Sequence, residues 1–324
     1  MKKKLVFLLS TLLILSMITA CGSNDDRIVL YSSGADYENE YYLERLEEKF
    51  PDYDIVLEYL TTGNHAAKLK AEGTNTEADI SLDLEYMYLE SISDSLADLS
   101  DYDFSIFTDD LVDPERKYLP ALRNSGSIIL NMDILEEKGL EEPKSYDDLL
   151  KPEYEGLVSM PSPKSSGTGF SFLKSIIESR GEDEAFEYFD KLSENILQFT
   201  SSGMGPLNAV VQGEAAIALG FTAQIVDVIN SGVNLKITSF EEGSPYNAYG
   251  HAIIKGKEER PEVKEVFDFF YDELIADTAA KYYPEALYKD RTFTIEGYPE
   301  DIEYADMGDT SAAEKERLMD KWEH

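Results

Sequence analysis

The chain has 324 residues, 43% of them hydrophobic, and a formal net charge of −36. This length and hydrophobic content suffice for one large or two medium domains with buried cores. The strongly negative charge repels phosphate polymers, which excludes nucleic-acid binding as the main activity.

The first 20 residues have the pattern of a secretory signal peptide. Lysines at positions 2–4 precede an apolar run over residues 5–18, which is too short to span a membrane. Residues 18–21, Ile-Thr-Ala-Cys, resemble a bacterial lipobox, which implies cleavage after residue 20 and a lipid on Cys21. The alternative is a plain secretory peptide with a chance cysteine. Because Cys21 is the single cysteine of the chain, no internal disulfide is possible.

After the leader, short apolar segments alternate with helix-like segments. Predicted strands at 28–31 and 54–60 precede predicted helices at 36–50 and 66–72. The plan recurs with a strand at 157–160 and a helix that ends at Gly181, and with a strand at 196–200 and a helix over 206–211. Such alternation is typical of α/β proteins with parallel strands, in which ligands bind at the carboxyl ends of the strands.

Each of these four strands leads into two hydroxyl residues and a glycine. The four tripeptides are Ser32-Ser33-Gly34, Thr61-Thr62-Gly63, Ser165-Ser166-Gly167 and Ser201-Ser202-Gly203. A helix N-terminus offers unpaired N–H groups and the positive end of the helix dipole, and the hydroxyls add further donors. If the four tripeptides converge, they form an anion-binding pocket. The alternative is that they are four ordinary N-caps, because Ser and Thr are favoured there without any ligand.

Further motifs follow one another in a specific order. They are Val29-Leu30-Tyr31-Ser32-Ser33, residues 68–73 with 77–80, residues 126–131, Ser165-Ser166-Gly167-Thr168-Gly169-Phe170, residues 212–217, and residues 242–245 with 252–256. On these motifs the chain resembles the type II substrate-binding proteins of bacterial ABC importers, in the group that binds ferric iron, phosphonates such as 2-aminoethylphosphonate, or sugar phosphates.

The resemblance implies an α/β fold with two lobes, crossing hinge strands and a central cleft that closes on the solute. Residues 27–123 and 240–324 form the first lobe, and residues 124–239 form the second. The partners implied are a small anionic solute, a membrane permease and its ATPase. We expect a monomer without cofactor, extracytoplasmic and anchored to the bacterial cell membrane through the lipid on Cys21.

The resemblance also indicates which residues contact the solute. Expected donors to an oxyanion are Ser32, Ser33, Thr62, Ser165, Ser166, Gly167, Thr168, Ser202 and Thr222. The remainder of the solute is expected to meet Tyr31, Asp83, Glu242 or Tyr246. An acidic group there suits an amine, as 2-aminoethylphosphonate requires.

Two alternatives keep the same scaffold. Iron-binding relatives place adjacent tyrosines after the motif that matches residues 212–219, whereas this chain has Gly-Phe-Thr-Ala-Gln at 220–224. The pairs at 41–42 and 282–283 lie in helix-like segments, which favours a packing role. Three histidines without ligand spacing predict no metal site. We therefore expect an anion as the ligand in preference to ferric iron. A polyamine is also a less favoured ligand, although the abundant Tyr, Asp and Glu would suit it.

A secreted serine hydrolase is the more distant alternative. Residues 171–174, Ser-Phe-Leu-Lys, match the S-x-x-K pattern of penicillin-recognising enzymes. Neither K-T-G nor S-D-N follows, and the segment has the pattern of a packed amphipathic helix. We therefore predict a binding protein and not an enzyme.

Overall fold

The computed structural model describes residues 27–324. The predicted signal peptide and the lipidation of Cys21 lie outside these residues. Within the described part of the chain, none of the helices combines the length and the apolar character that a bilayer crossing demands.

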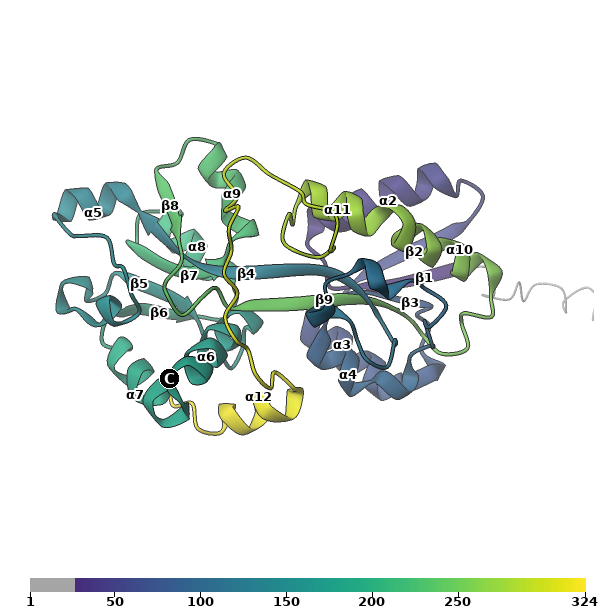
Figure 1. Ribbon diagram of the computed structural model, residues 1–324, viewed down its shortest axis with the longest axis horizontal. Helices are drawn as coiled ribbons and strands as arrows, with labels where there is room; N and C mark the ends of the chain where they lie inside the picture. Colours follow the sequence, from purple (N-terminus) through teal and green to yellow (C-terminus); the bar gives the residue numbers. More distant parts are fainter. Residues whose placement is uncertain (1–26) are drawn as a thin grey trace, which may run out of the picture.

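Two α/β lobes lie side by side and share two long antiparallel strands that run from one to the other (Figure 1). The sheet order is β2-β1-β3-β9-β4-β7-β5-β6, with β8 paired to β4 on a separate branch. The strands are β1 (Arg27–Ser32), β2 (Asp54–Tyr59), β3 (Ile80–Glu85), β4 (Leu119–Asn131), β5 (Val158–Pro161), β6 (Ile196–Thr200), β7 (Ile217–Phe221), β8 (Leu235–Thr238) and β9 (Tyr246–Ile253).

Parallel pairing holds the strands that carry the hydroxyl tripeptides. In the first lobe β1 pairs in parallel with β2 and β3, and in the second lobe β5 pairs in parallel with β6 and β7. Strand β4 pairs with β9 up to Ser125 and with β7 from Gly126, so it changes lobes between these two residues. The predicted mixed α/β architecture with crossing strands is therefore present.

Helices cover the sheet in both lobes (Figure 1). The first lobe contains α2 (Asp36–Lys49), α3 (Thr62–Glu72), α4 (Tyr86–Ser91), α10 (Pro261–Phe269) and α11 (Ile275–Lys281). The second lobe contains α5 (Met132–Lys138), α6 (Gly167–Arg180), α7 (Glu182–Leu192), α8 (Met204–Val211) and α9 (Ala223–Asn230). Helix α3 begins four residues earlier than predicted, at Thr62, so its tripeptide is part of the helix start.

Each lobe has its own apolar core. One core joins β1 and β3 to α2 and α10, and the other joins β4, β5 and β7 to α6 and α7. Helix α7 shows the sequence cause, since Ala185, Tyr188, Phe189 and Leu192 fall on one helical face and all four are buried. Separate cores allow the lobes to move as two bodies about the shared strands.

The C-terminal segment differs from the predicted division into lobes. Residues 240–324 were assigned together to the first lobe, but α12 (Ala312–Met319) packs on α6 and α7 of the second lobe (Figure 1). The physical reason is apolar burial, because Leu318 and Trp322 are buried in the second core and the Trp322 ring lies 5.3 Å from that of Phe189. The other lobe boundaries stay a prediction.

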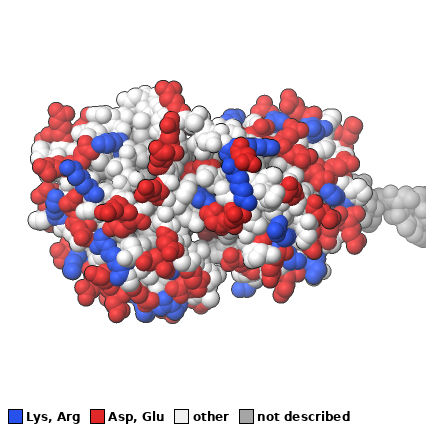
Figure 2. Space-filling view, viewed as in Figure 1, with Lys and Arg blue, Asp and Glu red and all other residues white. Residues whose placement is uncertain are grey.

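Acidic side chains dominate the surface of both lobes in the view of Figure 2. This distribution agrees with the net charge of −36. A general attraction for anions is therefore absent from this face, and any anion site must depend on donors at short range.

Candidate ligand-binding cleft

All four hydroxyl tripeptides line one cleft of about 760 Å³ between the lobes. Those at Ser33 and Thr61 lie in the first lobe, and those at Ser165 and Ser201 lie in the second. The volume falls in the range of small-molecule sites. The structure thus brings together four segments that are far apart in the sequence.

Ordinary capping accounts for few of these hydroxyls. Within residues 27–324, no side chain caps α3 or α8, although Thr61 occupies the N-cap of α3. Ser166 caps α6, but the Gly169 N–H donates to its Oγ over 3.5 Å, which is a long bond. The first N–H groups of α3, α6 and α8 are therefore mostly unclaimed by side chains.

Helix α2 is the exception, because a carboxylate closes its start. The Ala35 N–H donates to Glu38 Oε2 over 3.3 Å, in the manner of a capping box. A carboxyl group already occupies this N-terminus. An anionic ligand is consequently better served by α3, α6 and α8 than by α2.

The two tripeptides of the second lobe lie against each other. A Cβ added to Gly203 would lie 2.6 Å from Thr168 Oγ1 and 3.9 Å from Ser166 Oγ. Glycine is thus required at 203 by the close approach of Thr168. The hydroxyls of α6 and the first turn of α8 form one continuous group of donors.

Three buried carboxylates lie in the first-lobe wall. Glu38, Asp83 and Glu85 line the cleft, and each is at most 6% exposed. Burial raises the pKa of Glu38 to about 7 and the pKa of Asp83 well above its ordinary value. Burial also raises the pKa of Glu85, whose Oε1 accepts a 3.0 Å hydrogen bond from Asn247 Nδ2.

Two lysines line the second-lobe side. Lys164 is exposed in the loop before α6, and Lys315 reaches the cleft from α12. Sequence reasoning missed Lys315, Glu38 and Glu85. Glu85 could have been predicted from Asp83, because residues two apart on a strand share a face and Asp83 was already expected at the cleft.

Eight of the thirteen residues expected to contact the solute line the cleft. They are Ser33, Thr62, Asp83, Ser165, Ser166, Gly167, Thr168 and Ser202. Four of the others, Tyr31, Ser32, Thr222 and Tyr246, do not lie in its wall.

Local packing explains where these four side chains go. Ser32 Oγ donates to Asn39 Oδ1 over 2.6 Å, and Thr222 Oγ1 donates to Ser127 Oγ over 3.1 Å, both in buried positions. Tyr31 is fully buried among apolar residues of the first lobe. The Tyr246 ring lies 4.7 Å from the guanidinium carbon of Arg123, at a separate pocket.

Glu242, the last of the thirteen expected contacts, also points elsewhere. Its Oε1 accepts a 2.7 Å hydrogen bond from Arg180 Nη2 at the C-terminal end of α6. Helix α6 has its N-terminus at the cleft, so this ion pair lies at the far end of the helix.

The tyrosines supply no obvious phenolate for a metal. Tyr283 lines the cleft, but its hydroxyl lies 3.0 Å from that of Tyr37 and donates to Glu38 over 3.4 Å. Burial raises the pKa of Tyr283 well above its ordinary value, which disfavours the phenolate. Within residues 27–324, we find no cluster of three His, Cys, Asp or Glu side chains placed to hold a metal ion.

The S-x-x-K residues are occupied by other contacts. Ser171 Oγ donates to the Thr168 carbonyl over 2.8 Å, and Lys174 Nζ donates to Glu178 over 2.7 Å. Both Ser171 and Lys174 are at most 2% exposed. Neither side chain therefore has the arrangement of a nucleophile beside its base.

Comparison with known proteins agrees with this architecture. Residues 58–292 match the family described as bacterial extracellular solute-binding protein. An uncharacterized protein of Haemophilus influenzae is 27% identical over 271 residues, which cover 78% of this chain and 75% of that protein.

Solved structures share the fold over most of their length. The periplasmic binding protein AfuA from Actinobacillus pleuropneumoniae, with exogenous fructose-6-phosphate bound, has a TM-score of 0.78 at 24% identity, covering 91% of this chain and 97% of that one. Iron-bound HitA from Pseudomonas aeruginosa has a TM-score of 0.76 at 18% identity, covering 91% and 98%.

These structures confirm the predicted type II periplasmic-binding-protein fold, and the family match extends over more than half of the chain. The family is one of solute-binding proteins, which agrees with the prediction that the chain is not an enzyme. The chain therefore belongs to the bacterial extracellular solute-binding proteins.

Proposed function

We propose that this protein captures a small solute with a phosphate or phosphonate group and delivers it to an ABC importer. The observation that carries the proposal is the convergence of the four tripeptides on one cleft, with the starts of α3, α6 and α8 largely free of side-chain caps. Phosphoryl oxygens accept several hydrogen bonds each, so they suit a set of N–H and hydroxyl donors.

Capture would proceed by closure of the two lobes. Helix α3 belongs to the first lobe, whereas α6 and α8 belong to the second. An anion that bonds to both sides gains contacts only in the closed state, so it shifts the population toward closure by that difference in free energy. The strand change between Ser125 and Gly126 is the natural hinge.

The body of the solute would face the first-lobe carboxylates. Hydroxyl groups of a phosphorylated sugar can donate to Glu38, Asp83 and Glu85, and the amine of 2-aminoethylphosphonate can pair with them. The sugar phosphate bound by AfuA and the iron bound by HitA illustrate both ligand classes on this fold. The hydroxyl-rich wall and the absence of tyrosines at 222–224 favour the phosphorylated class here.

The proposal includes the lipid on Cys21 as membrane anchor, a monomeric state and a permease with its ATPase as partners. A lipid anchor would hold the protein near the permease without an amphipathic helix of its own.

Calorimetry with five probes tests the function. Fructose 6-phosphate, 2-aminoethylphosphonate and inorganic phosphate represent the anions, and ferric ion and spermidine represent the alternatives. We expect binding of at least one of the first two, with inorganic phosphate as a weaker competitor. Binding of ferric ion or spermidine alone would contradict the proposal.

A pair of variants on one helix tests the site. Ser166→Ala removes a hydroxyl from the cleft wall and should weaken binding by about 1–3 kcal/mol, the cost of leaving a polar group unpaired. Ser179→Ala is the matched control, since its Oγ bonds to the Ile176 carbonyl away from the cleft. Equal affinities of both variants and the wild type would reduce Ser166 to a helix cap.

A further inference from the structure

The C-terminal helix contributes a cation to the cleft. Lys315 lies on α12 and lines the cleft beside Gly167 and Thr168. After α11 the chain pairs with the first lobe at Tyr288 and Phe107, and then reaches α9 of the second lobe, where the Glu296 carbonyl accepts a hydrogen bond from Asn230. From there it crosses the hinge strands to α12 (Figure 1). This third connection between the lobes brings the end of the chain to the binding site.

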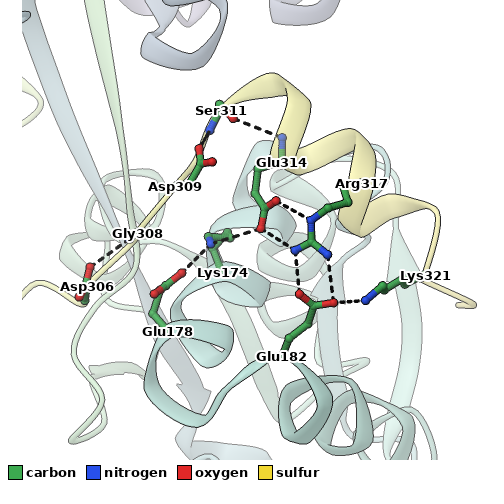
Figure 3. A network of polar contacts seen from close by, with 10 residues as sticks. All are labelled: Lys174, Glu178, Glu182, Asp306, Gly308, Asp309, Ser311, Glu314, Arg317 and Lys321. Atoms are coloured by element: carbon green, nitrogen blue, oxygen red, sulfur yellow. Dashed lines mark hydrogen bonds and ion pairs between the residues drawn. The ribbon is translucent and has the colours of Figure 1, made fainter.

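A network of ion pairs fastens α12 to α6 and α7 (Figure 3). Arg317 donates to both carboxylate oxygens of Glu182, over 3.1 Å and 2.7 Å, and also bonds to Glu314. Lys321 pairs with the same Glu182 carboxylate. Because the Arg317 contact is bidentate and the partners are shared, this network fixes the orientation of α12 better than an isolated surface ion pair would.

A buried lysine on α6 joins this network from beneath. Lys174 is 2% exposed, and its Nζ lies 2.7 Å from Glu178 and 3.9 Å from Glu314 (Figure 3). Together with the buried Leu318 and Trp322, these contacts fix α12 on the helix whose first turn carries the cleft hydroxyls. These contacts hold Lys315 close to the start of α6, and α12 also contacts α4 of the first lobe.

Lys315 has no polar partner within residues 27–324. Its Nζ lies 5.2 Å from the centre of the Phe170 ring on α6. The charge that acts on it is that of Glu85, whose carboxylate lies close to Gly167 at the start of α6 and forms no ion pair with Lys315 among the described residues. Burial lowers the pKa of Lys315, because no close anion compensates for the lost hydration. The other lysines of the α12 region are paired, as Lys174 and Lys321 show.

We infer that Lys315 is a solute-binding residue, which contacts the anionic group of the solute at the N-terminus of α6. This inference rests on the proposed function, since it names the charged partner of the same phosphate or phosphonate group. The helix supplies N–H groups and hydroxyls, and Lys315 supplies the full positive charge that these donors lack. The C-terminal helix is thereby part of the binding site.

Lys315→Met tests the inference with the full mature chain. The substitution keeps the length of the side chain and removes its charge, so we expect affinity for fructose 6-phosphate and 2-aminoethylphosphonate to fall by about tenfold or more. The dependence of the affinity on salt should also weaken. The thermal unfolding midpoint of the ligand-free variant should stay at or above that of the wild type, because an unpaired buried charge is lost.

Two further variants keep the outcome interpretable. Lys191→Met on α7 makes the same change of net charge at an exposed position and should bind like the wild type. Lys315→Arg keeps the charge and should therefore bind more tightly than Lys315→Met. If Lys315→Met does not fold, Lys315→Gln serves as the neutral variant in its place. Wild-type affinity in Lys315→Met, or an equal loss in Lys191→Met, overturns the inference. Absence of binding in the wild type instead overturns the proposed function.

Discussion

The two walls of the cleft carry opposite charges. The first-lobe wall contains the carboxylates of Asp36, Glu38, Asp83 and Glu85, and every acidic residue among the described cleft residues belongs to this side. The second-lobe wall contains Lys164 and Lys315. Hydroxyls and helix N-termini occur on both walls, so charge and not hydrogen-bonding capacity distinguishes them.

This difference would orient a solute that has two unlike ends. Lys315 and the donors at the start of α6 favour a phosphate or phosphonate group on the second-lobe side, whereas the first-lobe carboxyls, of which Glu85 lies close to Gly167, disfavour it when they are ionised. The other end of the solute meets acceptors, which suit hydroxyl or ammonium donors. Each lobe would then select a different part of one molecule, and closure would require both parts.

The largest expected effect is the loss of folding stability that follows when the buried Glu38 carboxyl in the first-lobe wall ionises. Because the pKa of Glu38 is raised to about 7, its protonated form is favoured in the folded protein relative to an ordinary value of 4.5. The stability gained from this proton is present below about pH 4.5 and is lost as the pH rises through 7. Glu38→Gln should therefore become more stable relative to the wild type, by about 2–3 kcal/mol between pH 4.5 and pH 8.

Denaturant unfolding at several pH values measures this difference. His65 and His251, whose pKa values burial lowers to about 4 and about 3, titrate in both proteins, so their contributions cancel in the comparison. Glutamine has one acceptor oxygen, which can keep the hydrogen bond from the Ala35 N–H and so the closed start of α2, while its amide nitrogen would donate to the Tyr42 hydroxyl. A pH-independent difference would mean that the pKa of Glu38 is the same in the folded and the unfolded protein.

A smaller effect distinguishes the two walls by their hydroxyls. Thr168→Val in the second-lobe wall should weaken binding of a phosphorylated solute by about 1–3 kcal/mol, because a buried donor to the anion is lost. Thr62→Val in the first-lobe wall should cost less than about 1 kcal/mol, since this side chain is partly exposed and faces the acidic side. Calorimetry gives both values, and equal losses would mean that the anion lies midway between the lobes.

Much of the fold and part of the cleft could be predicted from the sequence. The strands that precede the tripeptides follow from short apolar runs, and Gly181 ends α6 with a φ of 85°, as its position indicated. Eight of the predicted residues line the cleft because hydroxyls and glycine at strand ends have a local signature. Tyr31 and Ser32 do not line the cleft, because β1 lies between β2 and β3 and both of its faces are covered at these two residues, which a tripeptide pattern does not record.

Lys315 could not be found in this way. Its presence in the cleft depends on α12 docking on the second lobe, which is set by Trp322, Leu318 and the Arg317 to Glu182 pair. None of these contacts has a sequence period or a spacing that names its partner, because the paired residues are more than 100 positions apart. Long-range docking of a short terminal helix is therefore the part of the site that only the structure gives.

The smallest effect identifies what the acidic wall recognises. Glu85→Gln removes a negative charge close to Gly167, where a Cβ would collide with the Glu85 carboxylate, but keeps an acceptor for Asn247. Inorganic phosphate should bind the variant more tightly by about 1 kcal/mol, because a like charge near the anion is lost. If the amine of 2-aminoethylphosphonate pairs with Glu85, this ligand should bind the variant more weakly. A sugar phosphate should bind it more tightly, as inorganic phosphate does. Exposed Glu44→Gln on α2 is the control for net charge, and equal shifts in both variants would show that the wall does not discriminate. Whether each ligand binds the variant more tightly or more weakly therefore shows whether the first lobe contacts an ammonium group or a hydroxyl group of the solute.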